Sequence, residues 1–330
     1  MCIRDRTERP LLFFVVVALA CGLLVLSLRG GRGTAQVALF PCGAVALSLV
    51  VRASMFYLTP GFPGSDAWAH DELIRSMLST GHVPSEWSSP YYLHYPLMHA
   101  AVAAAAQVLG VSTRTALFVA VGLPLAFSAL ALGAVARRLL GVFAACLAVL
   151  ITLFSGYHLQ WGTQLIPTSM GLALFTVALT LTVARERRLP ADGLLLAVMA
   201  IAIVLCHTVS SFILWLTLAA FLLAASAARA MRSVAAPVGA TWHGTHALFL
   251  FVSVAMFAHW GASPYTTAGE SFFERILLTL RDTLQGEARF LSRPWENTAS
   301  GIGTELAAIS GFGLFYFLVV TGALFALRME

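Results

Sequence analysis

The chain has 330 residues, of which 59% are hydrophobic and only 11% carry a charged side chain. A soluble domain carries about 25% charged residues, so this composition excludes an ordinary water-soluble fold and predicts a protein that uses lipid as part of its solvent. The net charge is +5, and all twenty basic residues are arginines placed singly or in small groups between apolar segments. Such placement is typical of membrane-topology signals, and we expect no nucleic-acid partner.

The two ends of the chain are set apart from its apolar centre. Residues 1–10 form a short N-terminal tail, and its first part, residues 1–6, has the appearance of a translated assembly scar. Residues 11–330 are expected to form a single transmembrane domain. Because the chain stops directly after an apolar segment, both of its ends are candidates for truncation, and a C-terminal domain is a candidate missing part.

Nine apolar segments have roughly the length of a membrane-spanning helix, which needs about 20 residues. They cover residues 11–28, 35–53, 115–136, 139–155, 167–184, 193–207, 209–227, 245–261 and 306–327. The long apolar stretch over 193–228 is divided because His207 and its polar neighbours interrupt it. A tenth segment, 97–110, is short and rich in alanine. The sequence therefore predicts an all-α polytopic transmembrane helix bundle of about nine spans plus in-plane amphipathic helices.

The arginines orient these spans, because cytoplasmic loops carry an excess of Arg and Lys. Most of the arginines lie in short loops, which should all be on the cytoplasmic side of the membrane. This holds only if segment 97–110 does not cross the membrane and the N-terminus lies outside. Two large outer loops then cover residues 54–114 and 262–305, and they hold ten of the fifteen acidic residues. We therefore expect a multi-pass protein of the cell membrane whose functional face is extracytoplasmic.

The first outer loop contains a predicted helix from Asp66 to about Ser79. Ser65 is a favoured residue type for the N-cap, and Gly81 is placed to end the helix.

At 100° per residue, Asp66 and His70 fall on the apolar face of this helix. Asp71 falls on the opposite, solvated face, where its spacing allows an ion pair with Arg75. A carboxylate on an apolar face is costly unless it is paired or bound to a cation. Asp66 is therefore a candidate catalytic or metal-binding acid, with His70 as its catalytic neighbour. The alternative is that Asp66 only favours the helix N-terminus.

The rest of the first loop is rich in aromatic residues and histidine. Residues 87–99 include Tyr95, which precedes a proline. Tyrosine and tryptophan at the headgroup level are normally membrane anchors. The sharper hypothesis is a platform that contacts a sugar or a lipid, with Tyr95 as a substrate-binding residue.

Four further polar residues near the outer side are candidate substrate-binding residues. His158 and Gln164 lie in a predicted short outer loop, and His207 lies in the turn between two spans. These three could hydrogen-bond a phosphate or a sugar, or simply complete polar turns. Arg52 ends the second span on the outer side, where its guanidinium matches phosphate geometry, although snorkelling to the interface is the alternative.

The second outer loop contains an apolar stripe at helical spacing over residues 271–282, which predicts an interfacial helix. Glu270 and Glu274 are the acids beside it.

The order of these features resembles the membrane half of the GT-C fold glycosyltransferases, closest to oligosaccharyltransferase catalytic subunits. The resemblance is carried by the motif Gly-Ser-Asp-Ala-Trp-Ala-His over residues 64–70, the Tyr-Pro pair at 95–96, the Ala-rich in-plane helix, and a span ending in Arg-Arg. It covers residues 35–230 and is most specific over 61–100.

The resemblance implies a transferase with a polyprenyl-phosphate-linked sugar as donor and the lipid bilayer as its setting. Asp66 would match the family's catalytic acid, acting as a general base or as a ligand of a divalent metal, Mg²⁺ or Mn²⁺, with no other cofactor. A glutamate of the second outer loop, Glu270 or Glu274, would help to cover the site. The next outer loop, 157–167, lacks the family's second acidic motif, and the soluble domain with its Trp-Trp-Asp motif is absent. A monosaccharide transferase therefore fits better than an enzyme of protein N-glycosylation.

Two other classes stay open. A polytopic transporter or flippase would place ionisable residues and broken helices near the membrane midplane, whereas here the acids gather in the outer loops. A non-catalytic membrane assembly protein would leave Asp66 and His70 without a purpose.

Overall fold

The computed structural model describes residues 11–27, 34–58, 60–87, 90–183, 190–231, 240–264 and 269–284. Over these ranges the chain is mostly helical and has no β-strand, apart from one isolated bridge between Pro264 and Ser271. The all-α prediction is confirmed for this part of the chain. Helices suit a chain of this composition because they satisfy their backbone hydrogen bonds internally, which lipid cannot do.

The helices follow the hydropathy pattern closely. They are α1 (Leu11–Ser27), α2 (Thr34–Tyr57), α3 (Ser65–Thr80), η2 (Pro90–His94), α4 (Leu97–Leu109), α5 (Thr113–Leu117), η3 (Phe118–Gly122), α6 (Leu123–Leu140), α7 (Val142–Phe154), α8 (Gly156–Gln164), α9 (Pro167–Val183), α10 (Pro190–Cys206), α11 (Thr208–Met231), α12 (Ala240–Ala262) and α13 (Phe272–Leu284). The predicted break at His207 is confirmed between α10 and α11. The predicted span 306–327 lies outside the described residues.

Three stretches of the described chain are long and apolar enough to cross a membrane: Leu39–Tyr57, Thr113–Leu140 and Gly244–Ala262. Helices α7 and α8 form a pair bent by 52° that would make a fourth span if the two cross together. The other apolar stretches, such as Pro167–Val183 and the apolar part of α11, Thr208–Leu223, have 17 residues or fewer. At 1.5 Å per residue they reach about 25 Å at most, against a hydrocarbon core of about 30 Å. The structure thus supports three or four spanning helices, and the predicted nine are not confirmed.

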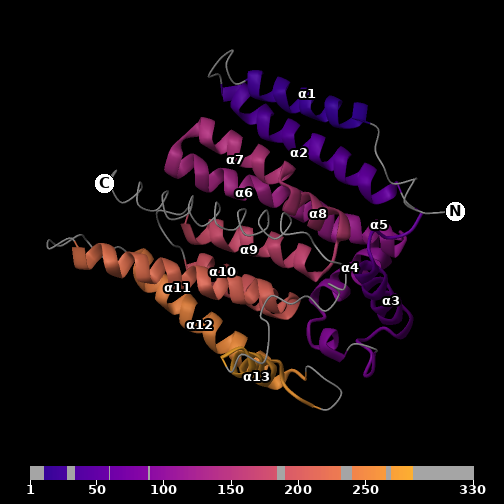
Figure 1. Cartoon of the computed structure of the whole chain (residues 1–330), viewed down its shortest axis with the longest axis vertical. Helices are drawn as coiled ribbons and strands as arrows, with labels where there is room; N and C mark the ends of the chain where they lie inside the picture. Colours follow the sequence, from indigo (N-terminus) through magenta and orange to yellow (C-terminus); the bar gives the residue numbers. More distant parts are fainter. Residues whose placement is uncertain are drawn as a thin grey trace. The chain divides into compact units, whose positions relative to one another are not determined.

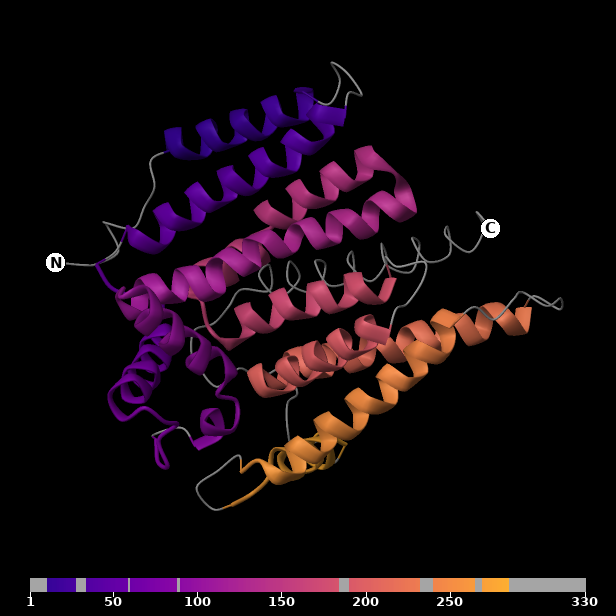
Figure 2. The ribbon, with the colours of Figure 1, turned by 180° about the vertical axis from the view of Figure 1, so that it is seen from behind.

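The chain forms two compact units, one made of residues 1–222 and 237–272, the other of residues 223–236 and 273–330. In the first unit, α6 packs against α7 and α9, α9 against α10, and α10 against α12. Helix α2 packs against α1 and α7. Figures 1 and 2 show α1, α2, α6, α7 and α9 running side by side. The predicted site residues belong to this first unit, except Glu274, the alternative to Glu270, which belongs to the second.

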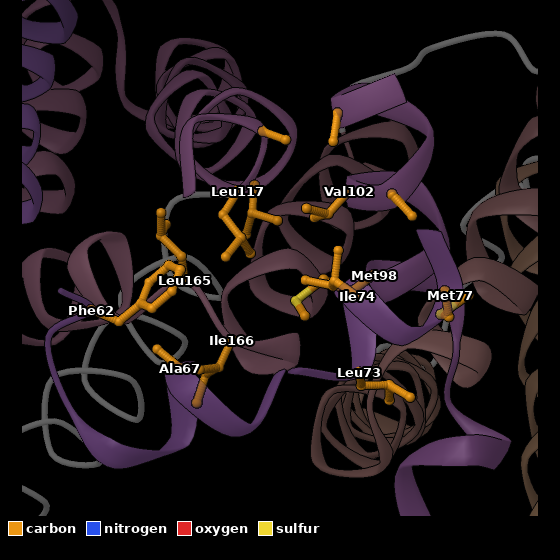
Figure 3. Close-up of a cluster of buried hydrophobic side chains, with 14 of the residues drawn as sticks. Phe62, Ala67, Leu73, Ile74, Met77, Met98, Val102, Leu117, Leu165 and Ile166 are labelled. Atoms are coloured by element: carbon orange, nitrogen blue, oxygen red, sulfur yellow. The ribbon is translucent and has the colours of Figure 1, made fainter. Parts of the chain in front are cut away.

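One end of the first unit carries the short elements that connect the long helices. We call this the loop end; it comprises α3, η2, α4, α5, α8 and the break between α10 and α11. A hydrophobic core holds it together, in which Ile74 of α3 lies against Met98 of α4 (Figure 3). Phe62 and Leu165 meet on the other side of the same core. Helix α4 has 13 residues, about 20 Å, which is too short to span a bilayer and agrees with the non-spanning helix predicted over 97–110.

The predicted helix of the first loop is confirmed as α3. Its C-terminal stop is Gly81, whose left-handed backbone lets its N–H bond to the Met77 carbonyl at 2.9 Å. The predicted N-cap is wrong by one residue: Gly64 precedes the helix, and Ser65 is its first residue.

Candidate functional site

The carboxylate that α3 buries is Asp71, whereas Asp66 is exposed. Asp71 accepts a hydrogen bond from the Thr113 hydroxyl of α5 and pairs with Arg75 at 2.7 Å, which confirms the predicted ion pair. The prediction that Asp66 lies on the covered face and Asp71 on the solvated face is wrong. Because α3 packs against both α4 and α5, the covered arc of the helix extends to Asp71.

Asp66 instead has an exposed side chain in the first turn of α3, and its catalytic role stays a prediction. A Cβ atom built on Gly64 would lie 3.9 Å from Nε2 of Gln164, so the end of α8 lies beside the start of α3. Gln164 is half-buried there. Gln164 therefore lies beside Gly64, which precedes Asp66 by two residues in the chain.

Behind Asp66, α3 and α4 are linked by two buried histidines. Nδ1 of His70 lies 2.9 Å from Nε2 of His99, and the ring of Tyr92 stands edge-on to His70 with centroids 4.7 Å apart. Burial lowers the pKa of His70 to about 3, with repulsion from His99 and His207 adding to the shift. Burial also lowers the pKa of His99 to about 4. At neutral pH both rings are thus uncharged and share one N–H between them.

His70 was predicted on the covered face, which is confirmed. His99 was missed. The available signal was its position one turn after Tyr95 in the apolar helix that begins at Leu97.

Arg52 is fully buried at the bend between α7 and α8. Its Nε donates to Ser48 at 2.9 Å, Nη1 to the His158 carbonyl at 3.0 Å and Nη2 to the Leu153 carbonyl at 3.2 Å. Nη2 also contacts Nδ1 of His158. These groups are all uncharged acceptors, and two are carbonyls at a helix break, where donors are needed. Arg52 and His158 therefore hold each other in the bend, and their predicted contacts with a ligand stay untested.

The segment that holds His158 and Gln164 is a helix, α8, and not the predicted short loop. The hydroxyl of Ser155 caps it by accepting from the His158 N–H at 3.3 Å. Helix α8 ends at Leu165, which is buried with φ of +51°, a conformation that side chains with a Cβ rarely adopt. Two glycines and few apolar residues hid this helix from the hydropathy pattern.

His207 occupies the break between α10 and α11. Its Nε2 lies 3.1 Å from the Thr168 hydroxyl of α9, and its Nδ1 lies 3.1 Å from the Ser210 hydroxyl. The next residue, Thr208, is hydrogen-bonded to the hydroxyl of Tyr91 in η2. These bonds explain His207 as a structural residue of the break, and its role in binding stays a prediction.

Tyr95 is buried in a group of rings that we call the aromatic cluster, formed by Tyr91, Tyr95, His259, Trp260 and Phe272. Ring centroids are 4.7 Å apart for Tyr91 and Tyr95, and 5.0 Å for Tyr95 and His259. Phe272 lies 4.9 Å from Trp260 and 5.7 Å from Tyr91. Burial raises the pKa of the Tyr95 hydroxyl, which therefore stays protonated and able to donate.

A short fold-back after α12 completes this cluster. The N–H of Phe272 donates to the Ser263 carbonyl at 3.1 Å, and Ser271 forms the isolated bridge with Pro264. Glu270 is half-buried directly before this bridge, at the edge of the aromatic cluster by its place in the chain. Sequence reasoning missed His259, Trp260 and Ser263 because their span reads only as an apolar segment.

A metal centre finds little support in the described residues. No group of three or more His, Cys, Asp or Glu side chains in these ranges could hold a metal ion. Asp66 alone does not make a divalent-cation site, because such ions take several oxygen ligands. The divalent metal, Mg²⁺ or Mn²⁺, therefore stays a prediction.

The structure thus joins Arg52 with His158, and His70 with Tyr95 through the rings of Tyr92 and Tyr91. Gln164 lies beside the start of α3, the helix that carries Asp66 in its first turn. No family model, curated protein or solved structure matches this chain. We therefore base the functional proposal on the arrangement of these residues and on the motif in residues 61–100.

Proposed function

We propose that this chain is a membrane glycosyltransferase that moves a sugar from a polyprenyl-phosphate donor to an acceptor hydroxyl at the extracytoplasmic face. The observation that carries the proposal is the exposed carboxylate of Asp66 in the first turn of α3, a helix whose start lies beside the half-buried Gln164 at the end of α8. The resemblance of the surrounding motif to the GT-C fold, and the apolar helices that bring a lipid-linked substrate within reach, support it.

Asp66 acts as the general base in this proposal. It takes the proton of the acceptor hydroxyl while the acceptor oxygen bonds to the anomeric carbon of the sugar. The bond between that carbon and the phosphate oxygen breaks, and the polyprenyl phosphate leaves with the electron pair.

The test is sugar transfer in proteoliposomes from a panel of polyprenyl-phosphate-linked hexoses and pentoses. Asp66→Asn should lower kcat by about 10²-fold to 10⁴-fold, the range for a lost general base. The matched control is Glu72→Gln, which neutralises another exposed carboxylate of the same helix and should leave transfer unchanged. Full activity of Asp66→Asn would remove the base from the proposal.

A transporter or flippase is the second candidate, and the bend between α7 and α8 favours it. Discontinuous helices with an intramembrane cation are typical of transport sites, and here Arg52 lies inside an apolar span next to a 52° bend. Counterflow of labelled polyprenyl-phosphate sugar between the leaflets of proteoliposomes, without transfer to an acceptor, would favour this class over the transferase.

A further inference from the structure

Two members of the aromatic cluster carry a buried polar group with no hydrogen-bond partner among the described residues: the Tyr95 hydroxyl and the Trp260 indole nitrogen. A third such group, Nδ1 of His99, lies one helical turn after Tyr95. The exposed fractions of these side chains are 1%, 3% and 0%. Leaving one such group unpaired costs about 1–3 kcal/mol, so buried polar groups are nearly always paired. Two unpaired donors in the same aromatic cluster, the Tyr95 hydroxyl and the Trp260 N–H, therefore need an explanation.

The three groups are parts of one structure. His99 lies one helical turn after Tyr95. The backbone carbonyl of Tyr95 would stabilise a protonated His99 ring, but it forms no hydrogen bond of ordinary geometry with Nδ1 of His99. Trp260 follows His259, which stands edge-on to Tyr95. In the same way the Tyr95 hydroxyl faces Ser263 but forms no well-aligned bond with it.

The chemistry of these groups selects the ligand. An indole N–H can only donate, and the Tyr95 hydroxyl stays protonated, so the partner must offer acceptor atoms. The aromatic cluster contains no arginine, lysine or carboxylate. A phosphate would be expected to have a cationic partner, whereas an uncharged ring with several oxygens and an apolar C–H face matches donors set among aromatic rings.

We propose that the aromatic cluster is the subsite for the sugar ring of the lipid-linked donor, with sugar oxygens accepting hydrogen bonds from Tyr95 and Trp260. The inference rests on the proposed function and names where its donor sugar binds. Tyr91, His259 and Phe272 are only half-buried, so the cluster reaches the surface of the first unit. The sugar enters from this exposed side of the cluster, and its apolar face packs on the rings.

The central variant is Tyr95→Phe, which removes one hydroxyl and keeps the ring. Binding of polyprenyl-phosphate sugar to the purified protein should weaken about threefold to tenfold, the loss of one hydrogen bond. Without ligand, the unfolding midpoint of the variant should stay unchanged or rise, because an orphan hydroxyl is removed. Trp260→Phe is the second variant and should weaken binding in the same direction. Tyr157→Phe changes an exposed tyrosine and serves as the control.

Three probes separate the sources of binding: polyprenyl-phosphate sugar, polyprenyl phosphate without sugar, and the free sugar. The subsite is supported if Tyr95→Phe weakens binding of the two sugar-bearing probes and leaves polyprenyl phosphate unaffected. The subsite is overturned if Tyr95→Phe weakens binding of all three probes equally or weakens binding of none. It is also overturned if the wild type does not bind a sugar-bearing probe. A lowered unfolding midpoint with unchanged binding would overturn it as well, because the hydroxyl would then serve the fold alone.

Binding and transfer can fail independently. Sugar binding that depends on Tyr95, in a protein without transferase activity, would reject the proposed reaction and keep the subsite. The opposite result is sugar transfer that needs Asp66 while Tyr95→Phe and Trp260→Phe change neither KM nor kcat. This result would reject the subsite and keep the proposed reaction.

Discussion

The buried histidine pair couples the stability of the loop end to pH. In the folded protein the pKa values of His70 and His99 are about 3 and about 4, whereas an unfolded histidine has a pKa of about 6.5. As the pH falls from about 6.5 towards 4, the unfolded chain therefore binds protons that the folded chain does not. The free energy of unfolding should fall over this window by up to about 1.4 kcal/mol per pH unit for each histidine, and should be constant above it.

Thermal unfolding of the detergent-solubilised protein between pH 7.5 and pH 4.5 measures this slope. Replacing one member, as in His99→Gln, removes one titrating group and should flatten the dependence on pH. His82→Gln replaces an exposed histidine of the same loop and should preserve the slope. Identical slopes for His99→Gln and the wild type would contradict the assignment of a buried neutral pair.

At the same scale, helical periodicity located part of the site and missed the rest. It placed His70 and Leu73 correctly on the covered face of α3, because both point into the core shared with α4. It misplaced Asp71, since the burial of that carboxylate depends on a hydroxyl from Thr113, which is distant in the sequence. Long-range donors of this kind leave no local signal in a single sequence.

Among the elements, α8 depends most on a single contact. Helix α8 passes so close to Arg52 that a Cβ atom on Gly162 would lie 1.5 Å from Nη1 of the guanidinium. Gly162→Ala should therefore displace Arg52 from the carbonyls of the bend. The free energy of unfolding should fall by about 2–4 kcal/mol, as expected for an overpacked site that also loses buried hydrogen bonds.

Gly156→Ala is the matched control for that substitution, because it lies in the same helix and a Cβ atom there meets nothing within 4 Å. Alanine is favoured over glycine in helices by about 0.5–1 kcal/mol, so this variant should be as stable as the wild type or slightly more stable. Loss of helical circular dichroism on heating measures both. Equal stability of the two variants would show that Arg52 does not hold the bend.

The long apolar helices were predictable from the sequence, whereas the bent ones were not. Apolar runs bounded by arginine, glycine or proline gave α9 and α10 nearly to their ends. Helix α8 lacks such a run, and only its cap at Ser155 and its packing around Arg52 establish it. Hydropathy reports burial in any apolar surroundings, so it cannot distinguish a straight span from a short helix beside a break.

For the whole molecule, the arrangement of helix ends bears on topology. Nη1 of Arg138 at the end of α6 donates to the Val183 carbonyl at the end of α9, at 3.1 Å, so these two ends lie on the same side of the first unit. At the loop end, Tyr91 of η2 bonds to Thr208 at the start of α11. We expect the end that carries Arg137 and Arg138 to be cytoplasmic by the positive-inside rule, and the loop end to lie on the other membrane face.

Cysteine labelling from outside the cell tests this arrangement in the intact molecule. In a cysteine-free background, Glu86→Cys of the first loop should react with a membrane-impermeant maleimide on intact cells, because Glu86 is exposed and we expect this loop to be extracytoplasmic. Arg137→Cys, exposed at the end of α6, should react only after the membrane is permeabilised. Labelling of Arg137→Cys on intact cells, with Glu86→Cys protected, would invert the topology and place Asp66 on the cytoplasmic face. A polyprenyl-phosphate donor presented outside could not then reach the proposed base.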